Sequence, residues 1–474
     1  MYFGNSATNS NEFSRLRPKR RLKVSIALCE GPIGDPVSIF SSLREEFPGE
    51  CFLLESVEGT SRTARYSFIG VDPLSVFKSR DHTVEIDGES FGVENPFINL
   101  REYFKSFDCG ASELAPFSGG IVGYLGYEMV RFLETVNGLD KKIDNMPESY
   151  FVLPNHLICI DHLNSRTFLI THGNLHDLQR SLKKIRRPEK PLVRIGKPMA
   201  NIEKKEYERI VEVAKSFILD GDIFQVVLSR RYEFSVEGDP LAMYIALRRI
   251  NPSPYLFFLD FNDVKLLGSS PEMLVRLEGK RLVTRPLAGT RRRDEDREED
   301  EKLKIEMLLD EKERAEHLML VDLSRNDLGR VSKFGTVKVT ELMAVEKYSH
   351  VQHIVSNVEG ELRDDCDAFD VLRSCFPAGT VSGAPKIRAM EVISELEKDP
   401  RGPYAGAVGY FDFTGNMDFA ITIRSITVSD GKAKIQAGAG IVADSVPINE
   451  FNETEHKMKA MLEAIRSISE EGFH

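Results

Sequence analysis

Short runs of β-branched and aromatic residues, separated by glycine and proline turns, fill the first half of the sequence from Leu22 to about Ile185. Such runs predict strands, as in Arg65–Gly70 and His156–Ile160. In the second half, strand-like runs stand beside long amphipathic segments, and the two kinds do not alternate as regular βαβ units. The sequence therefore predicts an α+β fold with a mainly antiparallel sheet, in preference to a doubly wound parallel one.

The order of the elements divides the chain near residue 195. Three prolines and several basic residues between Arg186 and Met199 predict a linker. We expect a flexible tail over residues 1–21, a strand-rich domain over 22–195 and a second domain over 196–474. The elements expected in the second domain are helices over Glu203–Leu219, about Glu295–Leu323 and about Glu450–Ile468, and strands over Val275–Leu277, Ile421–Arg424 and Lys432–Ala437.

Charge and cysteine usage restrict the partners and the compartment. The 474 residues carry a formal net charge of -11, which opposes binding to nucleic acid or to an anionic membrane surface. No window approaches the roughly 20 apolar residues needed to cross a bilayer, and the N-terminal segment lacks the apolar stretch of a secretory signal. The six cysteines include no Cys-x-x-Cys pair. We therefore expect a soluble, cytoplasmic protein with reduced thiols and with no nucleic-acid or membrane partner.

Acidic side chains on two expected helices point to a metal site. Glu313 and Glu316 lie three residues apart and so share a helix face, and Glu453 lies four residues before Lys457. The plain alternative is a solvated acidic surface, which spacing alone favours. Mg²⁺ usually takes one or two carboxylates and leaves its other positions to water and substrate. Glu316 and Glu453 are therefore the candidate ligands.

Three further segments place polar groups where strands are expected. Gly438–Gly440 closes an expected strand, and a turn there points backbone amides at an anion. Arg424 is expected on a strand face, from which an arginine binds a carboxylate through two parallel hydrogen bonds. Gly289 and Thr290 form an expected turn, and His353 lies in an expected strand. Ordinary turns and a structural histidine remain the alternatives.

Taken together and in this order, these segments resemble the chorismate-utilising enzyme family over roughly residues 50 to 465. Further matching motifs are Gly221–Ser229, Gly268–Met273 and Phe376–Lys386. The resemblance implies a two-sheet β-sandwich core flanked by helices, in two intimately joined subdomains. This fold agrees with the α+β prediction.

Two positions resemble the anthranilate-forming branch of that family. Ala288 stands where aminodeoxychorismate synthases commonly carry a lysine, and Gln225 stands where isochorismate and salicylate synthases carry a lysine that activates water. The sequence thus resembles the large, chorismate-aminating subunits of anthranilate synthases, which act first in tryptophan biosynthesis. An aminodeoxychorismate synthase without the lysine and a non-catalytic tryptophan-sensing homologue are the alternatives.

The resemblance also implies a reaction and its residues. Ammonia attacks chorismate at C2, the C4 hydroxyl leaves, and pyruvate is eliminated to give anthranilate, so a lyase is expected. The expected cofactor is Mg²⁺, held by Glu316 and Glu453 against the ring carboxylate, and His353 is the expected acid. The expected substrate-binding residues are Gly289, Thr290, Tyr404, Arg424, Gly438, Ala439 and Gly440. The expected catalytic residues are His353, Thr290, Glu272 and Gln225.

Regulation and partners follow from the same resemblance. Glu55, Ser56, Pro254, Tyr255 and Leu256 match the two segments that hold feedback-inhibiting tryptophan, although Leu256 stands where methionine is more usual. A pocket there is remote from the metal and makes the inhibition allosteric; ordinary strand and turn is the alternative. No cysteine has the glycine-flanked turn of a glutaminase nucleophile. A separate glutamine amidotransferase subunit is therefore expected to supply ammonia, in the family's usual heterotetramer of two large and two small subunits.

Overall fold

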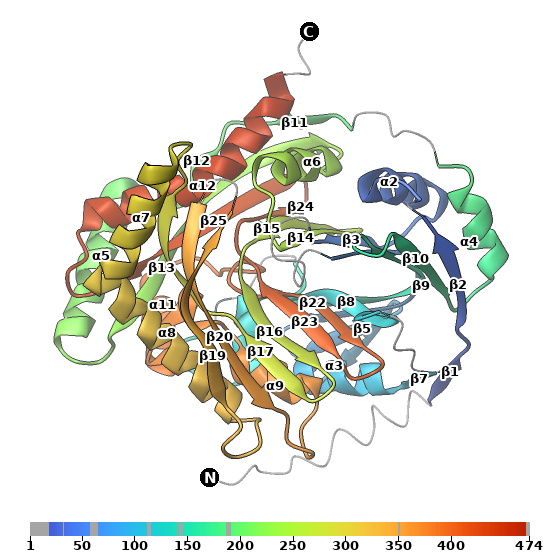
Figure 1. Cartoon of the computed structure of the whole chain (residues 1–474), viewed down its shortest axis with the longest axis horizontal. Helices are drawn as coiled ribbons and strands as arrows, with labels where there is room; N and C mark the ends of the chain where they lie inside the picture. The colour runs from blue at the N-terminus through green and yellow to red at the C-terminus, as the bar shows by residue number, and fades with distance from the viewer. Residues whose placement is uncertain are drawn as a thin grey trace.

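The structure is a computed structural model that describes residues 19–31, 33–56, 65–110, 115–139, 141, 146–185, 191–348 and 351–470. Strands occupy the centre of the molecule and helices surround them (Figure 1). Within these ranges no helix is long and apolar enough to cross a membrane. Residues 1–18 of the expected tail and 186–190 of the expected linker lie outside the described residues.

The strands form two antiparallel sheets that share two long strands. In spatial order, the first sheet contains β2 (Ser25–Glu30), β10 (Arg166–Thr171), β9 (Ser149–Asp161), β4 (Tyr66–Arg80), β3 (Cys51–Glu55), β14 (Tyr255–Phe261), β15 (Val264–Ser270), β24 (Ser425–Ser429), β25 (Lys432–Ile441) and β13 (Gln225–Gly238). The second contains β6 (Glu89–Gly92), β5 (Thr83–Ile86), β4, β9, β8 (Gly120–Leu125), β22 (Ala407–Asp412), β23 (Met417–Ile421), β16 (Met273–Glu278), β17 (Arg281–Thr284), β20 (Val351–Glu361) and β19 (Lys338–Lys347). Strand β18 (Leu287–Arg292) follows β17 and pairs with the other part of β20.

Short strands complete the pairing. Strands β11 (Val193–Ile195), β12 (Met199–Ala200) and β21 (Gly383–Ala384) pair with β13. Separately, β1 (Arg20–Leu22) runs parallel to β7 (Phe107–Cys109). Arg20 and Arg21, inside the expected tail, thus belong to a strand.

The shared strands β4 and β9 join the two sheets. The first half of β4 pairs with the second half of β9, and the remaining halves pair with each other in the second sheet. The register shifts between Pro73 and Ser75, next to Asp72, whose φ is 59°. Proline has no amide hydrogen for the ladder, so the regular pairing is interrupted at this corner. The two sheets are one hydrogen-bonded network folded over on itself.

Aromatic side chains fill the space between the sheets. Phe68 of β4 packs against Phe117 and Tyr410, with ring centroids 5.5 and 5.9 Å apart. Tyr150 of β9 lies 4.7 Å from Phe261 of β14. Side chains alternate between the faces of a strand, so every second residue reaches this layer. Burying one such ring stabilises the fold by roughly 1.5–3 kcal/mol relative to exposure.

Helices cover the outer faces. Four pack on the first sheet: α2 (Pro36–Glu46), α4 (Leu175–Leu182), α6 (Leu241–Ile250) and α12 (Pro447–Glu470). Five pack on the second sheet and on the start of β13: α3 (Pro96–Lys105), α5 (Lys204–Leu219), α8 (Glu311–Gly329), α9 (Ala368–Cys375) and α11 (Lys386–Leu396). The other described helices are α7 (Arg297–Leu309), α10 (Gly379–Ser382) and the 3-10 helix η1 (Tyr127–Phe132).

The α+β class and the mainly antiparallel core with outer helices are confirmed. Helix α5 follows its apolar stripe, since Tyr207, Ile210, Val211 and Ala214 are all buried. The division of the chain near residue 195 stays a prediction. Both expected parts contribute strands to each sheet, as the β3–β14 and β8–β22 pairs illustrate.

The prediction of a single helix over about 295–323 is wrong, because two helices, α7 and α8, occupy this segment. Asp310 separates them. Its carboxylate accepts hydrogen bonds from the amides of Lys312 and Glu313 at 3.0 and 3.1 Å, which caps a new helix. The cap fixes the start of α8 and with it the positions of Glu313 and Glu316.

Candidate active site

Gln225 and Glu316 meet where β13, β25 and α8 come together. The side-chain amide Nε2 of Gln225 donates a hydrogen bond to Oε1 of Glu316 at 2.9 Å. Gly440 of β25 makes room for this contact, because a Cβ at that position would lie 2.5 Å from Nε2 of Gln225. Three segments that are distant in the sequence thus place an amide and a carboxylate against a glycine.

Two carboxylates on separate helices provide hard oxygen ligands. Burial raises the pKa of Glu316, and the nearby charges of Glu313 and Glu453 raise it further. Glu453 of α12 forms an ion pair with Lys457 at 2.7 Å. The described ranges contain no group of three or more His, Cys, Asp or Glu placed to hold a metal ion. A pair of carboxylates with water and substrate oxygens fits Mg²⁺, which rarely uses an all-protein cage.

Cationic and hydroxyl groups line the neighbouring part of β25. Lys457 donates to the carbonyl oxygen of Gly438 at 2.8 Å, and Arg424 donates to the carbonyl oxygen of Lys457 at 3.2 Å. A Cβ on Gly438 would lie 3.0 Å from the hydroxyl of Tyr404. Burial lowers the pKa of Arg424, and Tyr404 and Glu453 oppose this shift. The Arg424 guanidinium retains donors for a substrate carboxylate.

The backbone of this region differs from the sequence-based expectation. Gly438 and Gly440 do not form a turn, since β25 continues through them in register with Ser229 and Val227 of β13. The methyl group of Ala439 points into the hydrophobic core. The strand expected over Ile421–Arg424 ends at Ile421, and Arg424 stands in a turn with φ of 51°. Glycine is needed at positions 438 and 440 for space.

His353 of β20 is held by two residues of β18. Its Nδ1 lies 3.1 Å from the carbonyl oxygen of Gly289 and 2.9 Å from Oγ1 of Thr290. A carbonyl oxygen only accepts, so the proton lies on Nδ1 and leaves Nε2 as an acceptor in the neutral ring. Burial lowers the pKa of His353 to about 4. At neutral pH the imidazole is uncharged.

Gly289 and Thr290 lie inside a strand, and the turn expected at them is wrong. The β18–β20 register shifts between Ala288 and Thr290, and Gly289 has φ of 69°. This β-bulge, with glycine at positive φ, turns Thr290 toward His353. Ala288 is a buried residue of the same strand.

Burial shifts the pKa of Glu272 in the opposite direction to that of His353. Glu272 is 6% exposed and lies between β15 and β16. Burial raises its pKa to about 8, although Thr380, the Leu287 amide and Lys457 oppose the shift. The carboxyl group is therefore protonated at neutral pH and has a proton to give.

A second site lies in a cleft of about 1250 Å³ that opens between the two sheets. All five residues expected to bind tryptophan line it: Glu55, Ser56, Pro254, Tyr255 and Leu256. Glu55 accepts hydrogen bonds from Tyr244 at 2.6 Å and from Arg248 at 2.9 Å. The structure thus brings these segments together in a cleft whose lining does not include Glu316, and tryptophan binding stays a prediction.

Lys457 was not among the expected site residues, and Glu313 was considered beside Glu316 but not chosen as a metal ligand. The i,i+4 spacing of Glu453 and Lys457 indicated their ion pair, but the bond from Lys457 to Gly438 joins a helix to a distant strand. Glu313 approaches Gly289, where a Cβ would lie 3.2 Å from its Oε2. Neither contact has a signature in local sequence.

The family model described as chorismate binding enzyme matches residues 49–463, and the chain belongs to that family. It is 46% identical to anthranilate synthase component 1 of Acetivibrio thermocellus, over 92% of this chain and 93% of the relative. The component 1 of Aquifex aeolicus is 45% identical, over 92% and 93%.

Solved structures agree with the sequence comparison. Anthranilate synthase component I from Streptococcus pneumoniae superposes with a TM-score of 0.75 at 37% identity, covering 84% of this chain and 92% of that one. The menaquinone-specific isochorismate synthase of Escherichia coli has a TM-score of 0.71 at 20% identity over 97% of each chain, which shows a shared fold.

Proposed function

We propose that this protein is the chorismate-aminating component of an anthranilate synthase, a lyase that converts chorismate and ammonia into anthranilate, pyruvate and water. The observation that carries the proposal is the contact between Gln225 and Glu316 beside Gly440. A glutamine amide cannot deprotonate water, so this position favours ammonia, which needs no base to act as nucleophile. The names of the relatives support the same branch.

The substrate's carboxylates meet complementary groups in this proposal. The hydroxyl of Tyr404 lies beside Gly438, Arg424 donates to the carbonyl oxygen of Lys457, and Thr290 in the bulge contacts His353. Glu316 and Glu453 would hold Mg²⁺, which when bound neutralises the charge between the acidic side chains and a dianionic substrate. Binding and orientation of the ring are thus distributed over β25, α8 and α12.

Proton transfer to the departing C4 hydroxyl needs a group that carries a proton at neutral pH. Glu272, with its pKa raised to about 8, meets this requirement. His353, with its pKa lowered to about 4, is neutral and offers Nε2 as an acceptor. We therefore assign the acid role to Glu272 and propose that His353 orients the substrate from the Thr290 side.

Ammonia is proposed to come from a separate glutamine amidotransferase subunit. All six cysteines are unpaired, and burial raises the pKa of Cys51, Cys109, Cys159 and Cys375, which disfavours the thiolate needed for glutamine hydrolysis. The relatives' designation as component 1 supports a partner component. We propose a cytoplasmic heterotetramer of two large and two small subunits.

Tryptophan is the proposed inhibitor, bound in the cleft that Glu55 and Tyr255 line. Arg248 and Tyr244 fix the Glu55 carboxylate, which then accepts from an ammonium group of the ligand. Because Glu316 does not line the cleft, inhibition requires two states of the protein with different affinities for chorismate.

The test of the proposed activity is direct. Purified protein is mixed with chorismate, Mg²⁺ and an ammonium salt at a pH no higher than about 8, the pKa of Glu272, and anthranilate is followed by its fluorescence. The proposal expects anthranilate to form, to require Mg²⁺ and to decrease when tryptophan is added. If chorismate is consumed and aminodeoxychorismate is the product, the protein is reassigned to the aminodeoxychorismate synthases. If no chorismate is consumed, the proposed enzymatic activity is wrong.

A further inference from the structure

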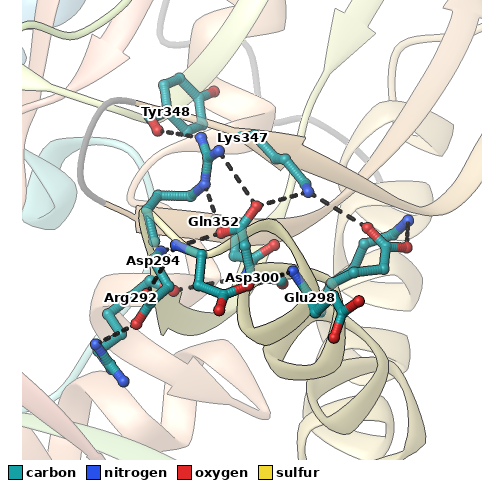
Figure 2. Close-up of polar contacts among 11 residues, drawn as sticks. Arg292, Asp294, Glu298, Asp300, Lys347, Tyr348 and Gln352 are labelled. Carbon is teal, nitrogen blue, oxygen red and sulfur yellow. Dashed lines mark hydrogen bonds and ion pairs between the residues drawn. The ribbon is translucent and has the colours of Figure 1, made fainter.

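Asp300, in the first turn of α7, lies at the centre of a charged cluster (Figure 2). The residue is 5% exposed. Arg293 donates to its two oxygens at 2.8 and 3.2 Å, and Lys347 donates to it at 2.8 Å. The hydrogen bonds from Arg293 and Lys347 hold the pKa of the Asp300 carboxyl well below its usual range. The group is therefore an anion at every pH at which the enzyme is expected to work.

The cluster joins three segments, and we call Arg293, Asp300, Lys347 and Gln352 the clamp. Arg293 follows the end of β18, Lys347 ends β19, and Gln352 belongs to β20. Arg293 also donates to the carbonyl oxygen of Tyr348 at 2.8 Å. Gln352 is fully buried and donates to the carbonyl oxygen of Asp300 at 3.2 Å. Hydrogen bonds thus join both strands of the β19–β20 hairpin to α7, and join the residue after β19 to the end of β18.

Helix α7 has few other means of attachment. Among its residues only Asp300 and Met307 are buried, so apolar packing contributes little to holding it in place. An anion that is shared by two cations from different segments resists separation, because loss of one partner leaves buried charge uncompensated. The clamp therefore fixes the position of α7 against the two strands.

The clamp adjoins the residues that surround His353. Gln352 directly precedes His353, and Thr290 pairs with His353 across the β18–β20 ladder. The ring of Tyr348 packs edge-on against the imidazole, with centroids 5.8 Å apart. A shift of the hairpin or of the end of β18 therefore moves the imidazole relative to Thr290.

We propose that Asp300 is a positioning residue for chorismate amination: it holds the end of β18 and the β19–β20 hairpin so that His353 and Thr290 keep their mutual geometry. The inference rests on the proposed function, which gives His353 its contact with substrate. Asp300 itself acts only through the segments it binds.

The test compares Asp300→Ala and Asp300→Asn with Glu301→Gln. Glu301 neighbours Asp300 and also pairs with Lys347, at 3.4 Å, but the described ion pairs give it no contact with Arg293, so it is the matched control. For Asp300→Ala we expect kcat to fall roughly 10- to 100-fold. We expect the KM for chorismate to stay within about twofold, because Tyr404 and Arg424 lie on elements outside the clamp. Asp300→Asn keeps an acceptor for Arg293 and should lose less.

A spectroscopic readout separates positioning from loss of fold. NMR titration of His353 should give a pKa near 4 in the wild type and a value closer to the ordinary one in Asp300→Ala, because water reaches the ring when the clamp opens. Glu301→Gln should match the wild type in both kcat and His353 titration.

The proposal is overturned if Asp300→Ala keeps its kcat and its His353 titration, or if its rate falls only in proportion to the fraction unfolded by circular dichroism. Should Asp300→Ala fail to fold, Asp300→Asn decides by the same criteria. A wild type that forms no anthranilate contradicts the proposed function alone, since the His353 titration still reports on the clamp.

Discussion

The side-chain amide of Gln225 donates to Glu316 and leaves its own carbonyl oxygen without a partner among the described residues. Burial, assisted by the charges of Glu313 and Glu453, raises the pKa of Glu316, and the hydrogen bond from Gln225 opposes that rise. One amide therefore helps to keep a proposed metal ligand ionised.

Replacing Gln225 by leucine removes the group that opposes protonation of Glu316. We expect the pKa of Glu316 to rise further, so that more Mg²⁺ is needed near neutral pH and the acid limb of kcat/KM moves to higher pH. Mg²⁺ titrations of anthranilate formation at several pH values measure both effects. Gln179→Leu on α4 is the control, and an unchanged Mg²⁺ dependence in Gln225→Leu would contradict this role.

Substitution Glu316→Gln removes one of two hard oxygen ligands. The rate at saturating chorismate should fall by roughly 100-fold or more, with partial recovery at high Mg²⁺. Treatment of the wild type with EDTA should abolish activity until Mg²⁺ is restored. Glu311→Gln, an exposed residue of the same helix, should behave as the wild type. Full activity of Glu316→Gln at low Mg²⁺ would exclude Glu316 as a ligand.

Loss of the Glu272 proton should inactivate the enzyme at high pH. Because the pKa of this carboxyl is about 8 in the fold, kcat should decline as pH rises through that value. Glu272→Gln should lose roughly 100- to 10,000-fold in kcat at all pH values, whereas the exposed Glu306→Gln should lose nothing. If kcat of Glu272→Gln still declines as pH rises through the same range, that decline belongs to the ionisation of another group.

The same carboxyl predicts how stability depends on pH. Its pKa is raised from 4.5 to about 8 in the folded state, so the fold binds this proton more tightly than the unfolded chain. The associated stabilisation is complete below the unfolded pKa and is lost as pH rises through about 8. Urea unfolding from pH 5 to pH 8.5 should show a decline in the free energy of unfolding that Glu272→Gln lacks.

Feedback inhibition is expected to depend on Glu55. In Glu55→Gln the carboxylate that Tyr244 and Arg248 fix is lost, and the tryptophan concentration for half inhibition should rise roughly tenfold or more. The rate without tryptophan should stay unchanged. Glu278→Gln, at another part of the same cleft, is the control. Calorimetry should also show that chorismate weakens tryptophan binding by the factor with which tryptophan weakens chorismate binding.

Gly440→Ala tests the spatial argument for the strand glycines. The added methyl group would lie 2.5 Å from Nε2 of Gln225, so the amide must leave its position on Glu316. We expect the chain to fold and kcat to fall roughly tenfold or more. Gly92→Ala, where an added Cβ meets nothing within 4 Å, is the control. Equal activity of the two variants would show that the Gln225 contact is dispensable.

Local patterns predicted the elements whose burial follows sequence period, such as α5 and the strand that carries His353. They failed where distant segments decide the backbone. Gly438 and Gly440 have the composition of a turn, but pairing with β13 keeps them extended. Asp310 lies within a run that predicts one continuous helix, but its carboxylate accepts hydrogen bonds from the backbone amides that follow it.

The candidate residues were identified by resemblance, and their mutual geometry was not. The bond from Gln225 to Glu316 and that from Lys457 to Gly438 each join a helix to a strand far away in the chain. The charge states of Glu272 and His353 depend on burial, which no spacing of residues encodes. In the sequence, Asp300 belongs only to an acidic run, and no local pattern predicts the contacts of the clamp.

The corner formed by β4 and β9 affects how the chain folds during its synthesis on the ribosome. Both strands are synthesised early, together with β3 and β8 beside them. The strand that pairs with β3, β14, and the strand that pairs with β8, β22, follow only after residue 254. Until then β3 and β8 present unpaired edges, and an open strand edge is a template for pairing with another chain. Non-local pairing of this kind slows folding and prolongs exposure. The nascent chain thus depends on protection from aggregation until its second half emerges.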